Sequence, residues 1–247
     1  MSEAQVNSGG RSDSPGSSRA ALLVVFLTVF IDLLGFGIVL PVMPRQAEPF
    51  LEALGLSAAA QGVVIGVLFS SFSLMQFLFS PLWGRLSDRF GRRPMLLLSL
   101  AGSVVFYAVY ALAVTVPATP APSRQQALLA IGLMLLSRIG AGIAGASVGT
   151  AAAVIADCTA PENRARGMAL IGIAFGGGFT LGPLIAYFGL AAFRQQPWGV
   201  GAIASALSLV AFLIAAAVFR ETRPTGGVGT RERPGLGRLA TVLSMPA

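Results

Sequence analysis

Two charged residues interrupt otherwise apolar stretches of the chain. Asp32 lies about halfway along the run Ala20–Val42, and Arg138 lies inside the run Ala127–Ala156. An ionised carboxylate near the centre of a bilayer costs at least ~2.5 kcal/mol, and burial disfavours the charged form. Asp32 therefore has the chemistry of a group that binds and releases a proton. The plainer alternative is that Asp32 only hydrogen-bonds a neighbouring helix.

An arginine buried at the depth of Arg138 needs a carboxylate, a carbonyl or water as partner. Asp32 is the other charged residue deep within an apolar run, so a direct pair between the two is one possibility. The alternative is a structural anchor in which the guanidinium reaches helix carbonyls. Depth along the sequence does not decide between the two.

A third set of charges forms a compact segment, Gly84-Arg-Leu-Ser-Asp-Arg-Phe-Gly-Arg-Arg-Pro94, between two apolar runs. Arginines and an aspartate in this number cannot lie in hydrocarbon, so the segment predicts a tight loop at a membrane face. Gly84 and Gly91 would permit the turn and a close approach of the backbone. In the simpler interpretation the arginines only set the topology and bind anionic headgroups.

Composition places these charges in a membrane protein. The chain has 247 residues, of which 55% are hydrophobic and 11% charged, whereas a soluble domain is typically about 25% charged. The net charge of +7 comes entirely from arginine. Because the arginines lie between apolar runs and not on a soluble face, a nucleic-acid partner is disfavoured.

The composition also argues against an enzyme. With no histidine and one cysteine, Cys158, we expect no metal site and no intrachain disulfide. The sequence contains no catalytic constellation and no phosphate-binding Gly-x-x-x-x-Gly-Lys loop. Proton chemistry would have to use carboxylates, and no cofactor is expected.

Six apolar runs are each near the ~20 residues needed to cross a bilayer. In lipid the backbone must satisfy its own hydrogen bonds, so we predict an all-α membrane protein with six transmembrane helices. The runs are Ala20–Val42, Gln61–Trp83, Pro94–Val116, Ala127–Ala156, Gly167–Phe188 and Trp198–Phe219.

The arginines predict the topology. With the amino terminus inside, thirteen arginines fall on the inner side, namely 11, 19, 85, 89, 92, 93, 164, 166, 220, 223, 231, 233 and 238. Three fall in outer loops, namely Arg45, Arg124 and Arg194. This bias predicts a multi-pass inner (plasma) membrane protein with both termini cytoplasmic. Residues 1–19 are predicted to form a disordered cytoplasmic tail, residues 20–219 the transmembrane bundle, and residues 220–247 a cytoplasmic linker that leads towards a missing second half.

Four segments together resemble one family. The segment Gly84–Pro94 is similar to the glycine–aspartate–arginine loop between helices 2 and 3 of the major facilitator superfamily of secondary transporters. Asp32-Leu-Leu-Gly-Phe-Gly-Ile-Val-Leu-Pro-Val-Met-Pro44 resembles the first-helix signature of proton-driven drug antiporters. The fourth run resembles the arginine-bearing helix of the family, through Arg138, Gly142 and Gly145, and ends in Val154-Ile-Ala-Asp157.

The fifth run looks like the antiporter signature, through Gly172, Gly176, Gly178 and Gly182-Pro183. The signature usually continues Gly-Pro-x-x-Gly-Gly, whereas this chain has Ala186 and the larger Tyr187. The resemblance covers roughly residues 22–219 and is nearest to the tetracycline:proton antiporter group. It implies a fold made of one six-helix bundle of the major facilitator type.

The resemblance also implies roles for residues. Asp32 would couple to protons or to a cationic substrate, and Arg138 would relay protons or orient the substrate. The cytoplasmic loop would act as a latch against helix ends, with Arg92 pairing with Asp157. The residues carried over to this latch are Gly84, Asp88, Arg89, Gly91, Arg92, Arg93 and Asp157.

The glycines of the fourth and fifth runs would let helices pack closely and seal the central cavity against proton leak. Small residues spaced by four positions allow such contact, and Pro183 should kink or weaken its helix. Ordinary helix packing is the alternative for these residues. The residues concerned are Gly142, Gly145, Gly172, Gly176, Gly178, Gly182 and Pro183.

The function that follows is secondary active transport, energised by a proton gradient, that exports a small lipophilic compound such as a drug or tetracycline-like molecule. The expected partners are membrane lipid, a small-molecule substrate, and either a missing carboxy-terminal half or a homodimer partner. Alternatives are a non-transporting six-helix membrane subunit, a truncated remnant, or a transporter of a sugar, organic anion or metabolite.

Overall fold

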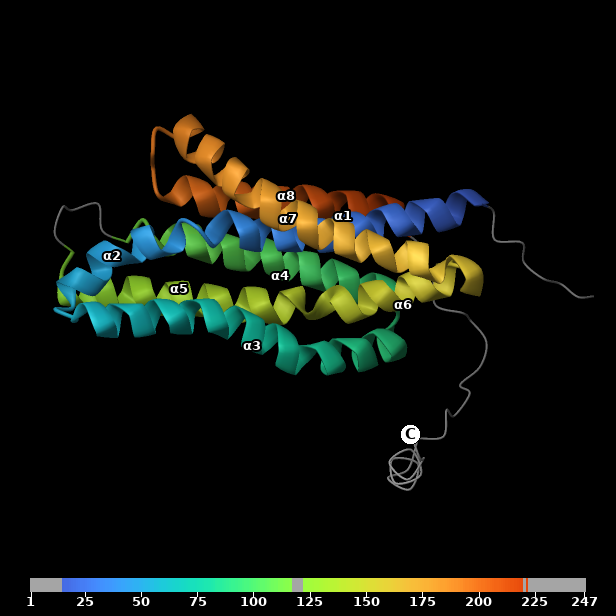
Figure 1. Cartoon of the computed structure of the whole chain (residues 1–247), viewed down its shortest axis with the longest axis horizontal. Coiled ribbons are helices and arrows are strands. Elements are labelled where there is room, and N and C mark those ends of the chain that lie inside the picture. Colours follow the sequence, from blue (N-terminus) through green and yellow to red (C-terminus); the bar gives the residue numbers. More distant parts are fainter. Residues whose placement is uncertain (1–14, 117–121, 220, 222–247) are drawn as a thin grey trace, which may run out of the picture.

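The computed structural model describes residues 15–116, 122–219 and 221. Within these residues it is helical, with no strand. Figure 1 shows long helices lying side by side in one elongated bundle. The helices are α1 (Pro15–Val39), α2 (Met43–Ala53), α3 (Ala58–Phe90), α4 (Arg92–Ala113), α5 (Arg124–Ala144), η1 (Gly145–Ser147), α6 (Val148–Cys158), η2 (Pro161–Asn163), α7 (Arg164–Ala192) and α8 (Trp198–Val218).

The six predicted spans are confirmed, because six stretches of the described chain are long and apolar enough to cross a membrane. They are Leu22–Val39, Ala58–Phe90, Arg92–Ala113, Arg124–Cys158, Pro161–Ala192 and Trp198–Val218. The first helix already begins at Pro15, inside the segment assigned to the tail, and residues 1–14 lie outside the described residues. Of the expected linker, the structure describes Glu221.

The charged segment after the second span is a shorter turn than the sequence predicts. Helix α3 runs on to Phe90 and α4 starts at Arg92, so the turn is the single residue Gly91. Gly91 has φ of +105°, a conformation that favours glycine. The prediction for Gly84 was wrong: it lies in α3, and an added Cβ would meet nothing within 4 Å. A helix of 33 residues is longer than the ~20 residues needed to cross a bilayer, so the charged last turns of α3 can extend beyond the apolar span without unwinding.

Helix α2 was not predicted. The sequence places residues 43–53 in an outer loop, but they form an amphipathic helix whose buried residues are Met43, Ala47, Phe50 and Leu51. This spacing puts the four on one helical face. A helix of this length is too short to cross a membrane, and hydropathy over a span-sized window averages its apolar face away.

Glycines bring α1 and α7 into backbone contact. A Cβ added at Gly37 of α1 would lie 2.6 Å from the carbonyl oxygen of Gly178, and one added at Gly182 would meet the backbone of Gly37. The departure from the antiporter signature is harmless here, since Ala186 is buried on the same face while Tyr187 is 69% exposed. Figure 1 shows α7 bending in its carboxy-terminal part, which contains Pro183.

The predicted packing glycines differ in what they meet within the described chain. Gly172 and Gly176 have nothing within 4 Å of an added Cβ and lie on the exposed side of α7. Gly142 and Gly145 of the fourth span contact α3 and not α7: a Cβ at Gly142 would meet the backbone of Phe72, and one at Gly145 would lie 3.3 Å from the amide of Gln76. A sequence gives the spacing of glycines but not the neighbour that each face meets.

The apolar core of the described residues forms three clusters, of which two are large and the third consists of Phe36, Phe72 and Ala141. One large cluster includes Ile38, Phe50 and Met134, and the other includes Val25 and Ile155. Buried polar residues lie between or beside these clusters: Thr28, Asp32, Ser71, Ser87, Ser99, Ser103, Ser137, Arg138, Ser147, Thr150 and Ser208. The candidate site is the part of this set around Asp32 and Arg138, and we call it the polar layer; its residues are Asp32, Ser99, Ser103, Arg138 and Ser147.

The α1–α7 contact yields a matched pair of substitutions. Glycine to alanine normally stabilises a helix interior by about 1 kcal/mol, so Gly176→Ala on the open face should leave the melting temperature unchanged or raise it. Gly182→Ala should lower the melting temperature, because the methyl group meets the backbone of Gly37 and overpacking costs about 1–3 kcal/mol. Thermal unfolding of the detergent-solubilised chain measures both, and equal behaviour of the two variants would contradict the packing described here.

Candidate functional site

Asp32 is 6% exposed and is surrounded by serine hydroxyls. Ser103 of α4 donates to Asp32 Oδ1 at 2.7 Å. The hydroxyls of Ser99 and Ser147 lie 3.4 Å and 3.3 Å from Oδ2. Serine hydroxyls both donate and accept, so this shell can satisfy the carboxylate in its ionised and its protonated form. The sequence predicted the burial of Asp32 but not these three partners.

Arg138 does not pair with Asp32. Within the described residues no ion pair joins the two, and the Nε and Nη2 atoms of Arg138 have no hydrogen-bond partner. The guanidinium, 1% exposed, lies over three aromatic rings instead, 5.8 Å from the centroid of Phe72, 5.6 Å from Tyr107 and 5.4 Å from Tyr110. Cation–π contacts are worth about 2 kcal/mol or more each when desolvated, which offsets part of the cost of burying the charge.

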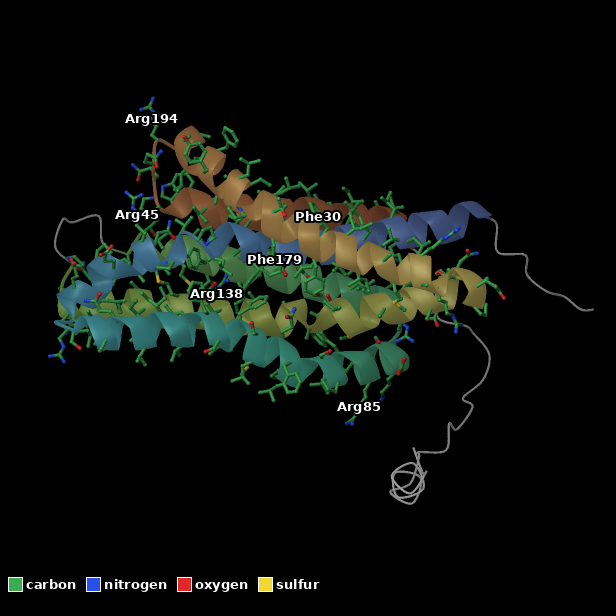
Figure 2. The ribbon with its side chains drawn as sticks, in the orientation of Figure 1. Phe30, Arg45, Arg85, Arg138, Phe179 and Arg194 are labelled. Atoms are coloured by element: carbon green, nitrogen blue, oxygen red, sulfur yellow. The ribbon has the colours of Figure 1, made fainter. Side chains whose placement is uncertain are left out.

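Tyr107 and Tyr110, two of the three aromatic residues around Arg138, also form hydrogen bonds to other parts of the chain. The hydroxyl of Tyr107 donates to the backbone oxygen of Asp32 at 3.4 Å, so the ring of Tyr107 lies between the acid and the arginine. The hydroxyl of Tyr110 donates to Gln46 of α2 at 2.7 Å, and Gln46 in turn donates to the carbonyl of Pro197 at 2.8 Å. Figure 2 shows Arg138 within the length of the bundle, with Arg45 and Arg194 at one end.

The fourth span is interrupted beside Asp32. Helix α5 ends at Ala144, one turn of 3₁₀-helix follows, and α6 begins at Val148. The carbonyl of Ala144 accepts from Ser99 at 2.6 Å and from Trp83 Nε1 at 3.2 Å. Non-helical backbone at membrane depth is tolerated where it is buried in protein with its polar groups satisfied, and these side chains meet that condition.

The predicted contact between Arg92 and Asp157 is present. Arg92 Nε lies 3.2 Å from Asp157 Oδ2. The same guanidinium contacts Asp88 Oδ1 at 2.6 Å and donates to Ser87 Oγ at 2.7 Å. Arg92 therefore joins the end of α3 to the end of α6, at the end of the bundle where Gly91 makes its turn.

The remaining arginines of the segment have other neighbours. Arg93 donates through Nη2 to the carbonyl of Ala216 in α8 at 2.8 Å, and Arg89 lies over the ring of Phe90 at 5.4 Å. Glu221, which sequence reasoning missed, accepts from the backbone N–H groups of Arg92 and Arg93 at 2.9 Å and 3.1 Å. A carboxylate at the amino end of α4 is favourable because of the helix dipole.

The comparisons agree with this architecture. The family model described as Major Facilitator Superfamily matches residues 25–245. The chain belongs to the major facilitator superfamily. It is 36% identical over 201 residues to the class E tetracycline resistance protein of Escherichia coli, and this match covers 81% of this chain and 44% of that protein. It is 35% identical over 205 residues to major facilitator superfamily domain-containing protein 10 of mouse, with coverage of 74% and 41%.

Solved structures give the same picture. The crystal structure of the human organic anion transporter MFSD10 (TETRAN) superposes with a TM-score of 0.63 at 32% identity, covering 84% of this chain and 49% of that one. The proton:xylose symporter XylE superposes with a TM-score of 0.66 at 19% identity and shows the fold. The chain thus spans about half the length of the superfamily members it matches.

The ion pairs of Arg92 generate a prediction about coupling. Asp157→Ala should lower the melting temperature of the otherwise unchanged chain, because Arg92 loses a half-buried partner. The same substitution should have little further effect in an Arg92→Ala background, since residues in one network are not additive. Asp88 is 68% exposed, and exposed pairs contribute about 0–1 kcal/mol, so Asp88→Ala serves as the weaker comparison. Additive shifts for Arg92 and Asp157 would show that the contact does not stabilise the protein.

Proposed function

We propose that this chain forms the amino-terminal bundle of a proton-coupled transporter that exports a small lipophilic compound. The observation that carries the proposal is Asp32, a carboxylate buried in a membrane span among neutral hydroxyls with no ion-pair partner in the described chain. Ionisable groups at such depth are costly and commonly mark ion pathways. The kinship with tetracycline resistance proteins supports drug export.

The shape of the surface is consistent with a lipophilic cargo. A depression of about 460 Å³ between α1 and α3 is lined by apolar and small polar side chains, within the size range of small-molecule sites. Its lining includes Phe36, whose ring centroid is 4.4 Å from that of buried Phe72. Phe72 in turn lies 5.8 Å from the guanidinium of Arg138, so Phe72 contacts both Phe36 of the lining and Arg138. The lining residues are Phe36, Leu40, Gly66, Phe69, Ser70 and Ser73.

We infer the orientation from the charges. The end of the bundle with the Gly91 turn carries most of the arginines of the described chain, and the opposite end carries Arg45, Arg124 and Arg194. The positive-inside rule then makes the Gly91 end, and both chain termini, cytoplasmic. The membrane would be the inner or plasma membrane.

The two spans that are least buried are α3 and the span that contains α7, each with 17% of its most apolar window buried. Their exposed residues include Phe77 at 75% and Ile173 at 59%. We propose that a carboxy-terminal half, or a second copy of the chain, covers these faces; a non-transporting subunit or a remnant would leave them to lipid. The mass of the native protein in its own membranes separates a double-length protein from a 25.4 kDa chain.

Asp32→Asn tests the proton-coupled function. The amide keeps the size of the side chain but cannot release a proton, so proton-driven accumulation of ethidium in everted membrane vesicles should fall to the background of vesicles without the protein. Glu52→Gln makes the same chemical change at an exposed residue of α2 and should transport normally. Proton-dependent transport by Asp32→Asn at an unchanged protein level would contradict the proposal.

A second candidate cargo, an organic anion, is favoured by Arg138. Its two nitrogen atoms without hydrogen-bond partners are donors in a buried, cationic layer, and one relative is an organic anion transporter. Carboxyfluorescein binding should weaken about tenfold or more in Arg138→Gln, since hydrogen bonds to charged groups contribute about 1.5–3 kcal/mol. Arg194→Gln, in an exposed loop, is the matched control. Equal affinity of both folded variants for carboxyfluorescein would exclude the anion as cargo of this site.

A further inference from the structure

The interruption at Gly145–Ser147 has the properties of a hinge. A 3₁₀ turn inside a longer helix often marks such a place. The carbonyl of Gly145 accepts from Gln76 Nε2 at 2.8 Å, and the carbonyl of Ala144 accepts from Ser99 and Trp83. Side chains of α3 and α4 thus hold the backbone of the break, and a change in those hydrogen bonds changes its geometry.

One residue of the break contacts the proposed proton site directly. Ser147 Oγ lies 3.3 Å from Asp32 Oδ2. Ser99 Oγ also lies near Oδ2, but it carries one proton and is much closer to the carbonyl of Ala144, at 2.6 Å against 3.4 Å. Ser99 therefore donates to the carbonyl, and Ser147 is left as the donor that serves Oδ2 of the ionised acid.

Protonation of Asp32 reverses this arrangement. If the proton settles on Oδ2, that atom becomes a donor and can give its hydrogen bond to Ser99 Oγ. The protonated oxygen is a much weaker acceptor than a carboxylate oxygen, so the hydrogen bond from Ser147 weakens and its hydroxyl can turn to a backbone carbonyl of its own helix, as serine hydroxyls do. The proton is bound and released as such, with no other bond made or broken. The hydrogen bonds of the break consequently differ between the two states of Asp32.

Helix α6 connects the break to the contact between Arg92 and Asp157. It runs from Val148 to Cys158 and bears Asp157 near its far end. At 1.5 Å per residue the arm from Ser147 to Asp157 is about 15 Å, so a tilt of about 10° moves Asp157 by about 2.5 Å. A displacement of that size is enough to break or make the contact with Arg92, which is 3.2 Å long.

We propose that Ser147 is the positioning residue through which protonation of Asp32 moves α6 and thereby opens or closes the Arg92–Asp157 ion pair. This inference rests on the proposed role of Asp32 as a proton-binding group. It adds the hinge, the moving helix and the residue that connects them.

The unsatisfied polar atoms of the described residues support a second arrangement of this region. The buried side-chain atoms without a hydrogen-bond partner are Nε and Nη2 of Arg138, Oγ1 of Thr150 and Oγ1 of Thr159. They lie on α5 shortly before the break, on α6, and directly after α6. Buried unpaired groups are costly and call for an explanation. A two-state element in this place, in which another position of α6 supplies partners, provides one.

Few other charges act on Asp32. Tyr107 of α4 approaches its backbone oxygen, and Arg138 of α5 lies beyond the ring of Tyr107. Of the other helices packed on α1, α8 contains no titratable residue, and α6 carries Asp157 and Cys158 at its far end. The titratable residues of α7 are Arg164 and Arg166 at its start and exposed Tyr187. The state of Asp32 is therefore the main pH-dependent event next to the break.

Cys158 offers a native reporter of α6. It is the one cysteine of the chain, it is half-buried, and it follows Asp157. Its rate of reaction with N-ethylmaleimide in native membranes can be measured below and above neutral pH. The ratio of the rate in the unaltered protein to that in Asp32→Asn cancels the ionisation of the thiol itself. We expect this ratio to change with pH by about fivefold or more, the usual lower range of coupling between linked sites.

Two serine variants decide the role of Ser147. Ser103→Ala removes a hydrogen bond from α4 to the same carboxylate and leaves the break unchanged. The ratio of its labelling rate to that of the double variant Ser103→Ala, Asp32→Asn should still depend on pH. The corresponding ratio for Ser147→Ala should not change with pH. If Ser147→Ala responds to pH as Ser103→Ala does, the coupling through Ser147 is wrong while proton coupling stands. If the ratio of the labelling rate in the unaltered protein to that in Asp32→Asn does not change with pH, the hinge is wrong. Transport by Asp32→Asn tests the proposed function separately.

Discussion

Keeping one carboxylate hydrogen-bonded inside a membrane bundle constrains most of this structure. Asp32 sits on α1 and takes its partners from α4 and from the break between α5 and α6. Three elements must therefore converge at one depth. The glycine contact of α1 with α7 holds α1 from the other side. A polar layer of this kind fixes the register of helices that apolar packing alone would leave free to slide.

The choice of hydroxyl groups over a cation matters for what the site can do. An arginine paired with Asp32 would stabilise the ionised form and leave a buried unpaired charge after protonation, which is strongly destabilising. Ser99, Ser103 and Ser147 can rotate their hydroxyls and serve either form. Arg138 is instead held by aromatic faces at Phe72, Tyr107 and Tyr110. The site thus contains a carboxyl group and a guanidinium that form no ion pair with each other.

The sequence was sufficient for the spans and for part of the site. Long apolar runs predict six helices because lipid leaves the backbone no alternative, and the family resemblance pointed to the contact of Arg92 with Asp157. Helix α2 was missed because its four buried residues do not raise the mean hydropathy. The serines around Asp32 were missed because serine is common in membrane helices and its spacing carries no signal. For Gly172 and Gly176 the spacing does not show which neighbour their helix face meets, and that face of α7 is exposed in the described chain.

A hinge is useful only if something beside it stays fixed, and α4 is the fixed member. Glu221 binds the amino end of α4 across the Gly91 turn, Ser205 of α8 donates to the carbonyl of Val104 at 2.8 Å, and Ser137 of α5 donates to the carbonyl of Phe106 at 2.7 Å. Helix α4 is therefore tied at one end by Glu221 and near its middle to two of its neighbours, α8 and α5. Because Arg92 begins this anchored helix and Asp157 lies near the end of the short helix after the break, we assign the proposed relative motion between them to α6.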